Sequence, residues 1–369
     1  MARRPLIRTP LHRQVADLLR REIHRRHEPG QRLPSEAMLA TQFGVSLVTL
    51  REALSALAQE GLLERRHGSG TYVAERSERP HIAICSAMDL GGSHPPYFQM
   101  RVVHQLMAGL QSAGQPVQVY FGGVQPGAEP KAGAIAGTGL AEAVTKRRVN
   151  GLIAIATPPD SDLIAQATAA GIPVVGDAPG FAHAVTTDIG AMIRGGIDRL
   201  ADSGRTRIAV QVWEDPHGTG TNVDLVRAAL AARQLEIHPE WIVSDLHPHI
   251  SGSGHRGFER LWQARAQGNA RSERPDGLLL CDDTYFPEAA MAILGAGIAV
   301  PRELQVVSFA NQGSGIFSPF PLTALEVDPD AYANACIALL LQLLSGEGRA
   351  PERVLIPHTR REHAQEQVP

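Results

Sequence analysis

The chain has 369 residues, 43% of them apolar and 20% charged, with a formal net charge of -3. At roughly 150 residues per domain this length predicts two to three domains, and the composition excludes wholesale disorder. No stretch approaches the ~18 uninterrupted apolar residues of a membrane span, so we expect no membrane partner.

Two further features of the whole chain indicate its compartment. The amino terminus lacks the apolar core and small-residue cleavage site of a secretory signal, which predicts a cytoplasmic protein. The cysteines Cys85, Cys281 and Cys336 form neither a metal spacing nor a disulfide framework, and they suit a reducing environment.

The charge is unevenly distributed. Residues 1–79 contain 14 arginines, no lysine and nine acidic residues, a balance of +5, whereas the rest contains 21 basic and 29 acidic residues, a balance of -8. A small basic head on a large acidic body predicts a head that contacts a polyanion. On charge alone, a solvated charged face is an equally open interpretation.

The head predicts three helices followed by a hairpin. Val15, Leu18, Leu19 and Ile23 recur at helical spacing and predict a first helix over 11–26. The remaining predicted segments are a helix capped by Ser35 and running to about Gln42, a tight turn at Gly44-Val45, a helix capped by Ser46 and ended by Gly61, and strands Leu62–Arg66 and Thr71–Val73 around a glycine-rich tip.

Two short helices joined by a tight turn, with polar residues at the start of the second, form the geometry that enters a DNA major groove. Arg51, in the first turns of that second helix, is expected to reach guanine or phosphate. The alternative is a generic three-helix bundle with a hairpin.

Residues 10–74 resemble the GntR-type DNA-binding domain. The motifs that carry the resemblance are Pro29-Gly-Gln-Arg-Leu-Pro-Ser-Glu36, Phe43-Gly-Val-Ser46, Thr49-Leu-Arg-Glu-Ala-Leu54, Glu60-Gly-Leu-Leu63 and His67-Gly-Ser-Gly-Thr-Tyr-Val73. The resemblance implies that the start of the third helix and the wing contact double-stranded operator DNA. The candidate DNA-binding residues are Ser35, Ser46, Thr49, Arg51, His67, Gly68 and Gly70.

The chain departs from that family at two positions. The family usually has arginines where this chain has Ala37 and Leu47, so those contacts are not carried over. Each lost bidentate contact removes about 1–3 kcal/mol of base discrimination. This departure leaves open a second hypothesis, a ligand-binding protein whose head binds DNA without specific recognition. Arg3, Arg4 and Arg8 are either a DNA-binding arm or a disordered basic tail.

A short charged segment closed by proline, residues 75–80, predicts a linker between a head of residues 1–74 and a body of residues 81–369. The body alternates apolar β-rich runs with helical patterns, which predicts an α/β fold with parallel sheets, and its length predicts two lobes. A Gly-, Ala- and Pro-rich stretch at 122–139 predicts a surface loop. The predicted strands are 81–86, 117–121, 151–157, 172–176, 207–212, 277–281 and 305–309, and the predicted helices lie near 97–113, 140–148, 160–170, 190–203, 222–233, 255–267, 285–296 and 330–345.

The body resembles LacI-type regulators, whose fold is similar to periplasmic sugar-binding proteins. The motifs are Val185-Thr-Thr-Asp188, Ser203-Gly-Arg-Thr-Arg-Ile-Ala209, Asp276-Gly-Leu-Leu-Leu-Cys-Asp-Asp283, Gly297-Ile-Ala-Val-Pro301, Leu304-Gln-Val-Val-Ser-Phe309 and Pro321-Leu-Thr323. The resemblance implies a two-lobed periplasmic-binding-protein-like domain, a hinge of several crossings, a sugar or sugar derivative in the cleft, and a homodimer formed through the body. The combination with the head resembles arabinose-repressor-type chimeras.

The family pattern places polar candidates in the cleft. Asn222 stands where the family has an arginine, and Asp282 where it has a ligand-binding asparagine. Ala310 stands where the family has an aspartate, with Asn311 beside it. We predict that Asn222, Asp282 and Asn311 bind the effector.

Five further residues have two interpretations each, and His247 shares the two that are given below for His249. Tyr97 and Phe98 are candidate effector-binding residues because sugar sites pair apolar faces with few polar groups, but a place in the lobe core is equally open. Asp283 is interpreted mainly as the N-cap of the following helix. His249 is either close to the cleft or exposed to solvent.

No motif predicts catalysis, a metal or a cofactor. The sequence contains neither a Gly-x-Ser-x-Gly elbow nor a phosphate-binding Gly-Lys-Ser/Thr loop, and Gly252-Ser-Gly254 predicts only a turn. Some GntR-type proteins carry an aminotransferase-like body that binds pyridoxal phosphate through a lysine. The two lysines of this chain, Lys131 and Lys146, lie in no such motif.

The combined prediction is a homodimeric transcriptional regulator, most simply a repressor, whose operator affinity is controlled by a small molecule between the lobes. Relief of repression by the ligand is the favoured direction, and co-repression is the alternative. A metabolite enzyme with a regulatory head stays as a third hypothesis.

Overall fold

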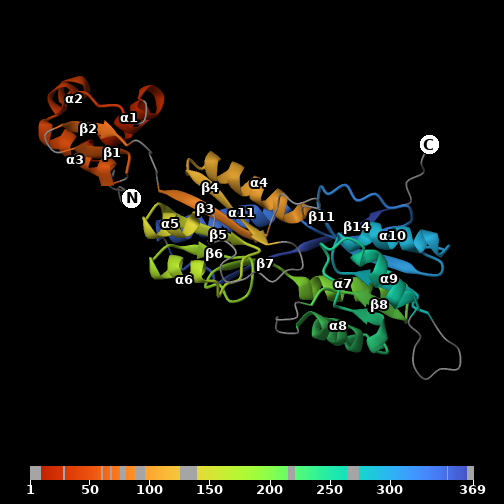
Figure 1. Cartoon of the computed structure of the whole chain (residues 1–369). Helices are drawn as coiled ribbons and strands as arrows, with labels where there is room; N and C mark the ends of the chain where they lie inside the picture. The colour runs from red at the N-terminus through yellow and green to blue at the C-terminus, as the bar shows by residue number, and fades with distance from the viewer. Residues whose placement is uncertain are drawn as a thin grey trace, which may run out of the picture.

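The computed structural model describes residues 10–27, 30–59, 61–66, 69–74, 80–88, 96–124, 139–214, 221–263, 274–346 and 348–363. Its elements form a helical head with a small hairpin and a body with two parallel sheets (Figure 1). Among the residues described, no helix combines the length and the apolar character needed to cross a bilayer.

The head follows the predicted order of elements. It consists of α1 (Leu11–Arg26), α2 (Glu36–Phe43), α3 (Leu47–Gln59) and the antiparallel pair β1 (Leu63–Arg66) and β2 (Gly70–Val73). Ser35 Oγ accepts a hydrogen bond from the Met38 amide, and Ser46 Oγ accepts one from the Thr49 amide. Each serine thereby satisfies an amide at the start of a helix, as the sequence predicts.

One apolar core holds the head together. Val15, Leu19 and Ile23 are buried in a cluster that includes Leu50 and Leu54 of α3. The prediction that Leu18 belongs to this stripe is wrong, because its side chain is 52% exposed. The buried residues Val15, Leu19 and Ile23 are spaced four apart and face the core. Leu18 lies to the side of this stripe and is not part of the buried cluster.

The amino-terminal lobe is built on a parallel sheet of strand order β4-β3-β5-β6. Its strands are β3 (His81–Met88), β4 (Val117–Val124), β5 (Val149–Ile155) and β6 (Val174–Val175), and its helices are α4 (Tyr97–Ser112), α5 (Leu140–Thr145), α6 (Asp162–Ala169) and α11 (Pro329–Ser345). Strand β3 is buried along nearly its whole length, as expected for a parallel strand covered on both faces. Helix α11 returns from near the end of the chain to pack on α4 and β5.

The carboxyl-terminal lobe is built on a second sheet of order β14-β12-β11-β10-β8-β9, in which only β14 runs antiparallel to its neighbour. Its strands are β8 (Ile208–Gln211), β9 (Ile242–Val243), β10 (Gly277–Leu280), β11 (Gln305–Asn311), β12 (Leu322–Val327) and β14 (His358–His363), and its helices are α7 (Ile189–Asp202), α8 (Thr221–Ala232), η2 (Pro239–Trp241), α9 (Ser253–Gln263) and α10 (Tyr285–Gly295). The segment after β10 and the end of β11 line a cavity together with the start of α4, so the carboxyl ends of these strands lie beside the other lobe.

The lobes are joined by a hinge of several strands. A parallel pair, β7 (Ala184–Thr187) and β13 (Arg353–Ile356), extends the first sheet through a bridge between Gly176 and Ala184. Within the described ranges the chain passes between the lobes three times, from β7 to α7, from β12 to α11 and from β13 to β14. Two of these crossings open into helices capped by an aspartate. Asp188 accepts from the Ala191 amide at 2.8 Å, and Asp328 accepts from the Asp330 amide at 2.9 Å.

The predicted α/β fold with parallel sheets is therefore confirmed, and each strand and helix proposed for the body is found within a few residues. Residues 264–267, the end of the helix predicted near 255–267, lie outside the described part of the chain. The predicted loop over 122–139 is wrong at its start, because residues 122–124 continue β4. Residues 125–138 lie outside the described part of the chain. The short strands β7, β9, β12, β13 and β14 were not predicted.

The interpretation of Gly252-Ser-Gly254 as only a turn is incomplete, because Gly254 is also a packing contact. Glu288 of α10 accepts from the amides of Gly252 and Gly254, and a Cβ at Gly254 would lie 2.2 Å from the Tyr285 carbonyl oxygen. We expect Gly254→Ala to lower the free energy of unfolding by about 1–3 kcal/mol. Gly295→Ala is the control. A Cβ there meets nothing within 4 Å, so it should gain about 0.5–1 kcal/mol of stability. Urea titration of both variants checks this, and equal stability would contradict it.

Candidate functional site

The start of α3 presents a small polar group on the surface of the head. Ser46 Oγ lies 2.9 Å from Thr49 Oγ1; the Ser46 side chain is exposed and that of Thr49 is half-buried. Because the first amides of a helix and short hydroxyl side chains both suit phosphate oxygens, this end of α3 can contact a nucleic-acid backbone.

Arg51 lies on the same helix and is tied to α2. Its Nε donates to Glu36 Oε2 at 2.7 Å, and its side chain is 60% exposed. Glu36 Oε1 also lies 3.8 Å from Arg65 Nη2 in the wing. Exposed ion pairs add little stability, so the effect of Glu36 is to orient two guanidinium groups without burying them.

A groove of about 440 Å³ runs between α2 and the wing, and it is lined by arginines that the sequence analysis did not single out. Arg32 and Arg65 lie in it together with Ser35 and Gly70. Gly70 has a φ of 123°, and a Cβ there would lie 3.0 Å from Arg32 Nε. The glycine therefore allows the close approach of Arg32 to the wing. Arg32 belongs to the Pro29–Glu36 motif, so its position in that motif could have identified it as a candidate residue of the groove.

Two predicted wing residues, His67 and Gly68, lie outside the described residues, as do Arg3, Arg4 and Arg8. The positions where the family's arginines are absent are visible. Ala37 lies in the first turn of α2, and Leu47 begins α3, where it is exposed beside Val48.

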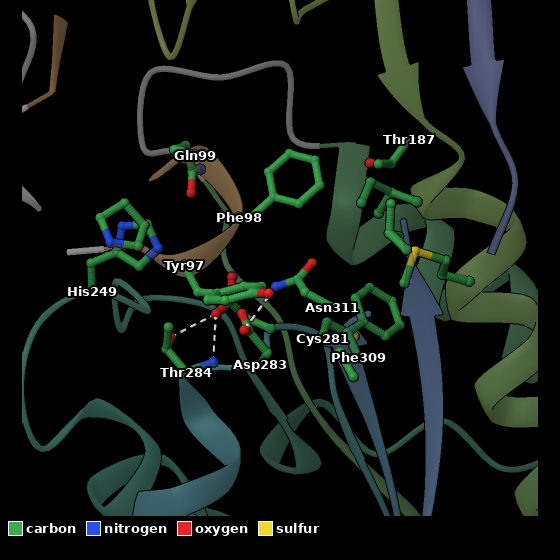
Figure 2. A pocket seen from close by; sticks show the side chains of 16 residues that line it. Tyr97, Phe98, Gln99, Thr187, His249, Cys281, Asp283, Thr284, Phe309 and Asn311 are labelled. Carbon is green, nitrogen blue, oxygen red and sulfur yellow. Dashed lines mark hydrogen bonds between the residues drawn. The ribbon is translucent and has the colours of Figure 1, made fainter. Parts of the chain in front are cut away.

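A cavity of about 240 Å³ lies between the two lobes (Figure 2). Its amino-terminal-lobe side is formed by the start of α4, with Tyr97, Phe98 and Gln99. Its other side is formed by the segments that follow β10 and end β11. Ligands of open parallel sheets bind at the carboxyl ends of the strands, and this cavity has that position.

Asp282 and Asp283 follow β10 and make different hydrogen bonds. Asp282 Oδ1 accepts from the Thr284 amide at 2.9 Å and from Thr284 Oγ1 at 2.6 Å. Asp283 Oδ2 accepts from Asn311 Nδ2 at 2.7 Å, across the edge of the sheet. The interpretation of Asp283 as a helix cap is therefore wrong. Helix α10 starts after Thr284 without a side-chain cap, and Asp283 faces the cavity instead.

Both carboxyls lie in surroundings that disfavour their charge. Burial and then the neighbouring Asp282 charge raise the pKa of Asp283 to about 7, against the opposing effects of Asn311 and His249. Burial also raises the pKa of Asp282, although hydrogen bonds from Thr284 act in the other direction. Burial lowers the pKa of His249, which keeps that imidazole neutral near pH 7.

The two predicted aromatics do line the cavity. Phe98 also packs edge-on against Tyr332, with ring centroids 5.2 Å apart, so it belongs to both the lobe core and the lining. The Tyr97 hydroxyl donates to the Gln312 carbonyl oxygen in the other lobe over a long distance of 3.4 Å. Tyr97 therefore links the lobes directly.

We expect Tyr97→Phe to favour an open arrangement of the lobes by about 0.5 kcal/mol, because it removes only this long hydrogen bond. Amide hydrogen exchange near the cleft should become faster while the melting temperature stays close to that of the parent chain. The control is Tyr285→Phe, which removes a hydroxyl bonded to the Leu246 carbonyl within one lobe. Identical exchange in the cleft for both variants would contradict the prediction.

The remaining residues that were predicted to bind the effector do not all lie at the cavity. Asp282 and Asn311 line the cavity, but Asn222 does not. Its Nδ2 donates to the Trp213 carbonyl at 2.8 Å and ties the start of α8 to the segment after β8. His249 lines the cavity and is half-buried, which favours the first of its two interpretations. Gln99 and Thr284 also line it, and no motif in the sequence pointed to them.

Two family models match the chain. Residues 11–73 match the model of bacterial regulatory proteins, gntR family. Residues 197–362 match the model of a periplasmic binding protein-like domain.

Curated relatives match over a short stretch at higher identity. The mannosyl-D-glycerate transport/metabolism system repressor MngR of Escherichia coli (strain K12) is 52% identical over 81 residues, which are 22% of this chain and 34% of that protein. The HTH-type transcriptional repressor NagR of Bacillus subtilis (strain 168) is 43% identical over 67 residues, 18% of this chain and 28% of that protein. The chain thus matches about a third of the length of these curated relatives.

Solved structures of LacI-type regulators match most of the chain. The transcriptional regulator CelR in complex with cellobiose has a TM-score of 0.62 at 18% identity, over 89% of this chain and 98% of that one. A LacI-family regulatory protein from Chloroflexus aggregans has a TM-score of 0.63 at 15% identity, over 78% and 98%. At these identities the likeness shows the fold. The chain therefore joins a gntR-family winged helix-turn-helix head to a two-lobed body of the periplasmic-binding-protein-like fold found in LacI-type regulators.

Proposed function

We propose that this protein is a transcriptional repressor that binds operator DNA through its head and is released by a small molecule bound between the lobes. The observation that carries the proposal is the joining of a gntR-family head to a hinged body with a cavity in its cleft. MngR and NagR are named as repressors, and CelR is described in complex with cellobiose. A sugar or sugar derivative is accordingly the proposed effector class.

The proposed organisation is a head of residues 1–74, a linker of residues 75–80 and a body of residues 81–369. The candidate DNA contacts are those at the start of α3 and along the wing. The candidate effector contacts are Tyr97, Phe98, Asp282, Asp283 and Asn311, whereas contact through Asn222 requires movement of its present hydrogen bond. We assign no catalytic role and no cofactor. Since the proposed target is chromosomal DNA, the proposed location is the cytoplasm.

The proposed repressor is a homodimer formed through the body. Exposed apolar side chains lie on α4 and α10, which both run along the upper side of the body in Figure 1. They are Met100 and Met107 of α4, Met291 and Leu294 of α10, Phe121 of the edge strand β4, and Phe317. Exposed large apolar side chains of this kind are candidates for an interaction surface. A two-fold dimer would present two heads to a pseudo-palindromic operator.

Operator selection with the full chain tests the proposal, followed by titration of the selected DNA with a panel of sugars at fixed salt. An effector that weakens DNA binding must itself bind more weakly to the DNA complex, by the same factor. A selected operator whose affinity no sugar changes would refute the regulatory part. Failure to select any operator would refute the DNA-binding part.

A further inference from the structure

The cavity between the lobes contains two adjacent carboxyls, Asp282 and Asp283, and neither forms an ion pair with a described arginine, lysine or histidine. Thr284 donates to Asp282, and Asn311 donates to Asp283. A buried acid elsewhere in the same lobe is paired differently, since Asp276 Oδ2 lies 3.1 Å from Arg207 Nη2. Among the described residues, the ionisable side chains that line the cavity are Tyr97, His249, Cys281 and the two aspartates. At neutral pH the charges that these groups carry are therefore negative.

The raised pKa of Asp283 measures how unfavourable this arrangement is. Burial removes water from both carboxyls, and the charge of Asp282 disfavours ionisation of Asp283, whereas a hydrogen bond from Asp283 favours the ionised form of Asp282. As a result, the Asp283 carboxyl holds a proton more readily near neutral pH than an ordinary aspartate does. A cation that enters the cavity would replace that proton and relieve both effects.

A third acceptor lies in the same lining. His249 Nδ1 is buried and has no hydrogen-bond partner among the described residues. Because burial keeps the imidazole neutral, this nitrogen can accept a hydrogen bond when the proton is on Nε2. Figure 2 shows Tyr97, Asp283, Thr284 and Asn311 gathered on one side of the cavity, with His249 beside Tyr97. Two carboxylates and one ring nitrogen offer acceptors for the three N–H donors of an ammonium group.

The aromatic side chains and the size of the cavity narrow the ligand further. Tyr97 and Phe98 supply ring faces, which attract both the C–H face of a sugar and a cation. The volume of about 240 Å³ lies below the roughly 300–1,000 Å³ of pockets for drug-sized ligands, so it suits one sugar ring. We propose that the effector is a monosaccharide-sized polyol that carries a protonated amine, an amino sugar in chemical class, with the ammonium group seated on Asp282 and Asp283. This inference rests on the proposed function for the location of the site and goes beyond it in the class of ligand.

Isothermal titration of the full chain with matched sugar pairs tests the inference. The pairs are D-glucosamine with D-glucose, D-galactosamine with D-galactose, and D-mannosamine with D-mannose, and the N-acetyl derivatives serve as neutral forms of each amine. At about pH 7 we expect at least one amine to bind about tenfold more tightly than its hydroxyl and N-acetyl counterparts, as for a hydrogen-bonded charge pair. Equal or tighter binding of the neutral members would overturn the inference, and so would the failure of every amine to bind.

The variant Asp283→Asn should remove most of the preference for the amine, measured as the ratio of the amine affinity to the neutral-sugar affinity in the same variant. The matched control is Asp224→Asn, which removes an acidic charge that is exposed on α8 beside Arg227, and which should keep the preference. Loss of the preference in both variants would indicate that the acidic body as a whole attracts the amine, and it would overturn the proposed contact between the ammonium group and Asp283.

A pH series gives a test without a variant. Asp283 faces Asp282 on its own segment, His249 from the loop before α9, Tyr97 from α4, and Cys281 at the end of β10. Between about pH 7 and about pH 5.5 Asp283 gains its own proton, so the preference for the amine should fall about tenfold. A preference that is constant over this range counts against the inference. If a neutral hexose releases the operator and no amine does, the inference fails and the proposed function stands. If no operator can be selected, the proposed function fails, and the sugar titrations still test whether the cavity prefers an amine.

Discussion

Replacing Met291 with glutamate is expected to convert the proposed dimer into monomers and to lower operator affinity by about 100-fold. Met291 is 68% exposed on α10, Leu294 lies one turn further along that helix, and Phe317 is 61% exposed. In a dimer these apolar side chains would be covered, and a carboxylate among them would be buried without a partner. A monomer holds one head, so it loses the gain in effective concentration that the second head provides.

Sedimentation velocity measures whether the Met291→Glu chain is a monomer, and titration of the operator at fixed salt measures its DNA affinity. The control is Ile237→Glu, which places the same charge on a side chain that is 37% exposed between α8 and η2. That variant should sediment and bind as the parent chain does. A Met291→Glu chain that remains dimeric would show that the two-fold contact uses another face.

The second large effect is expected at the head. Arg51→Ala should reduce the preference for the selected operator over random DNA by roughly tenfold to hundredfold, the range of one bidentate base contact. Arg51 is exposed near the start of α3, and Glu36 holds its guanidinium at 2.7 Å. The loss should appear at one base position within each half-site.

Fluorescence anisotropy with both DNAs at several salt concentrations separates the two hypotheses for the head. The control is Arg227→Ala, an exposed arginine on α8 whose partner is Asp224. If Arg51→Ala weakens the operator and random DNA by the same factor, Arg51 contacts phosphate only, and the head lacks specific recognition through this residue. That outcome would agree with the presence of Ala37 and Leu47 at the two positions where the family usually has arginines.

The parts of the fold that were predictable from the sequence are those governed by local interactions. Ser35 and Ser46 cap α2 and α3 through amides three residues away, so each signal lies within a single turn. The strands that were missed pair over long separations. Strand β7 pairs with β13, so that Thr187 lies beside Ile356, and β12 pairs with β14. Short strands of this kind show little periodicity of their own, because their partners determine them.

The candidate cleft shows the same limit at the level of single side chains. The sequence placed Asp282 and Asn311 near a ligand, and both line the cavity. It assigned the wrong role to Asp283, because a carboxylate before a helix looks like a cap unless its partner is known. That partner, Asn311, comes from the next strand of the sheet, 28 residues along the chain. Asn222 was predicted to bind the ligand because it stands where the family has an arginine. The structure shows that its side chain instead donates to the Trp213 carbonyl, a contact that the family pattern does not reveal.

The return of α11 to the amino-terminal lobe has a consequence for synthesis and for truncated chains. The head is complete at Val73, and its core contains no residue from the body. The amino-terminal lobe, in contrast, lacks α11 and β13 until residue 356 has been made. Since domains fold as their residues emerge from the ribosome, the head forms first and both lobes form late. A stop codon anywhere between the two therefore yields a folded head attached to an incomplete body.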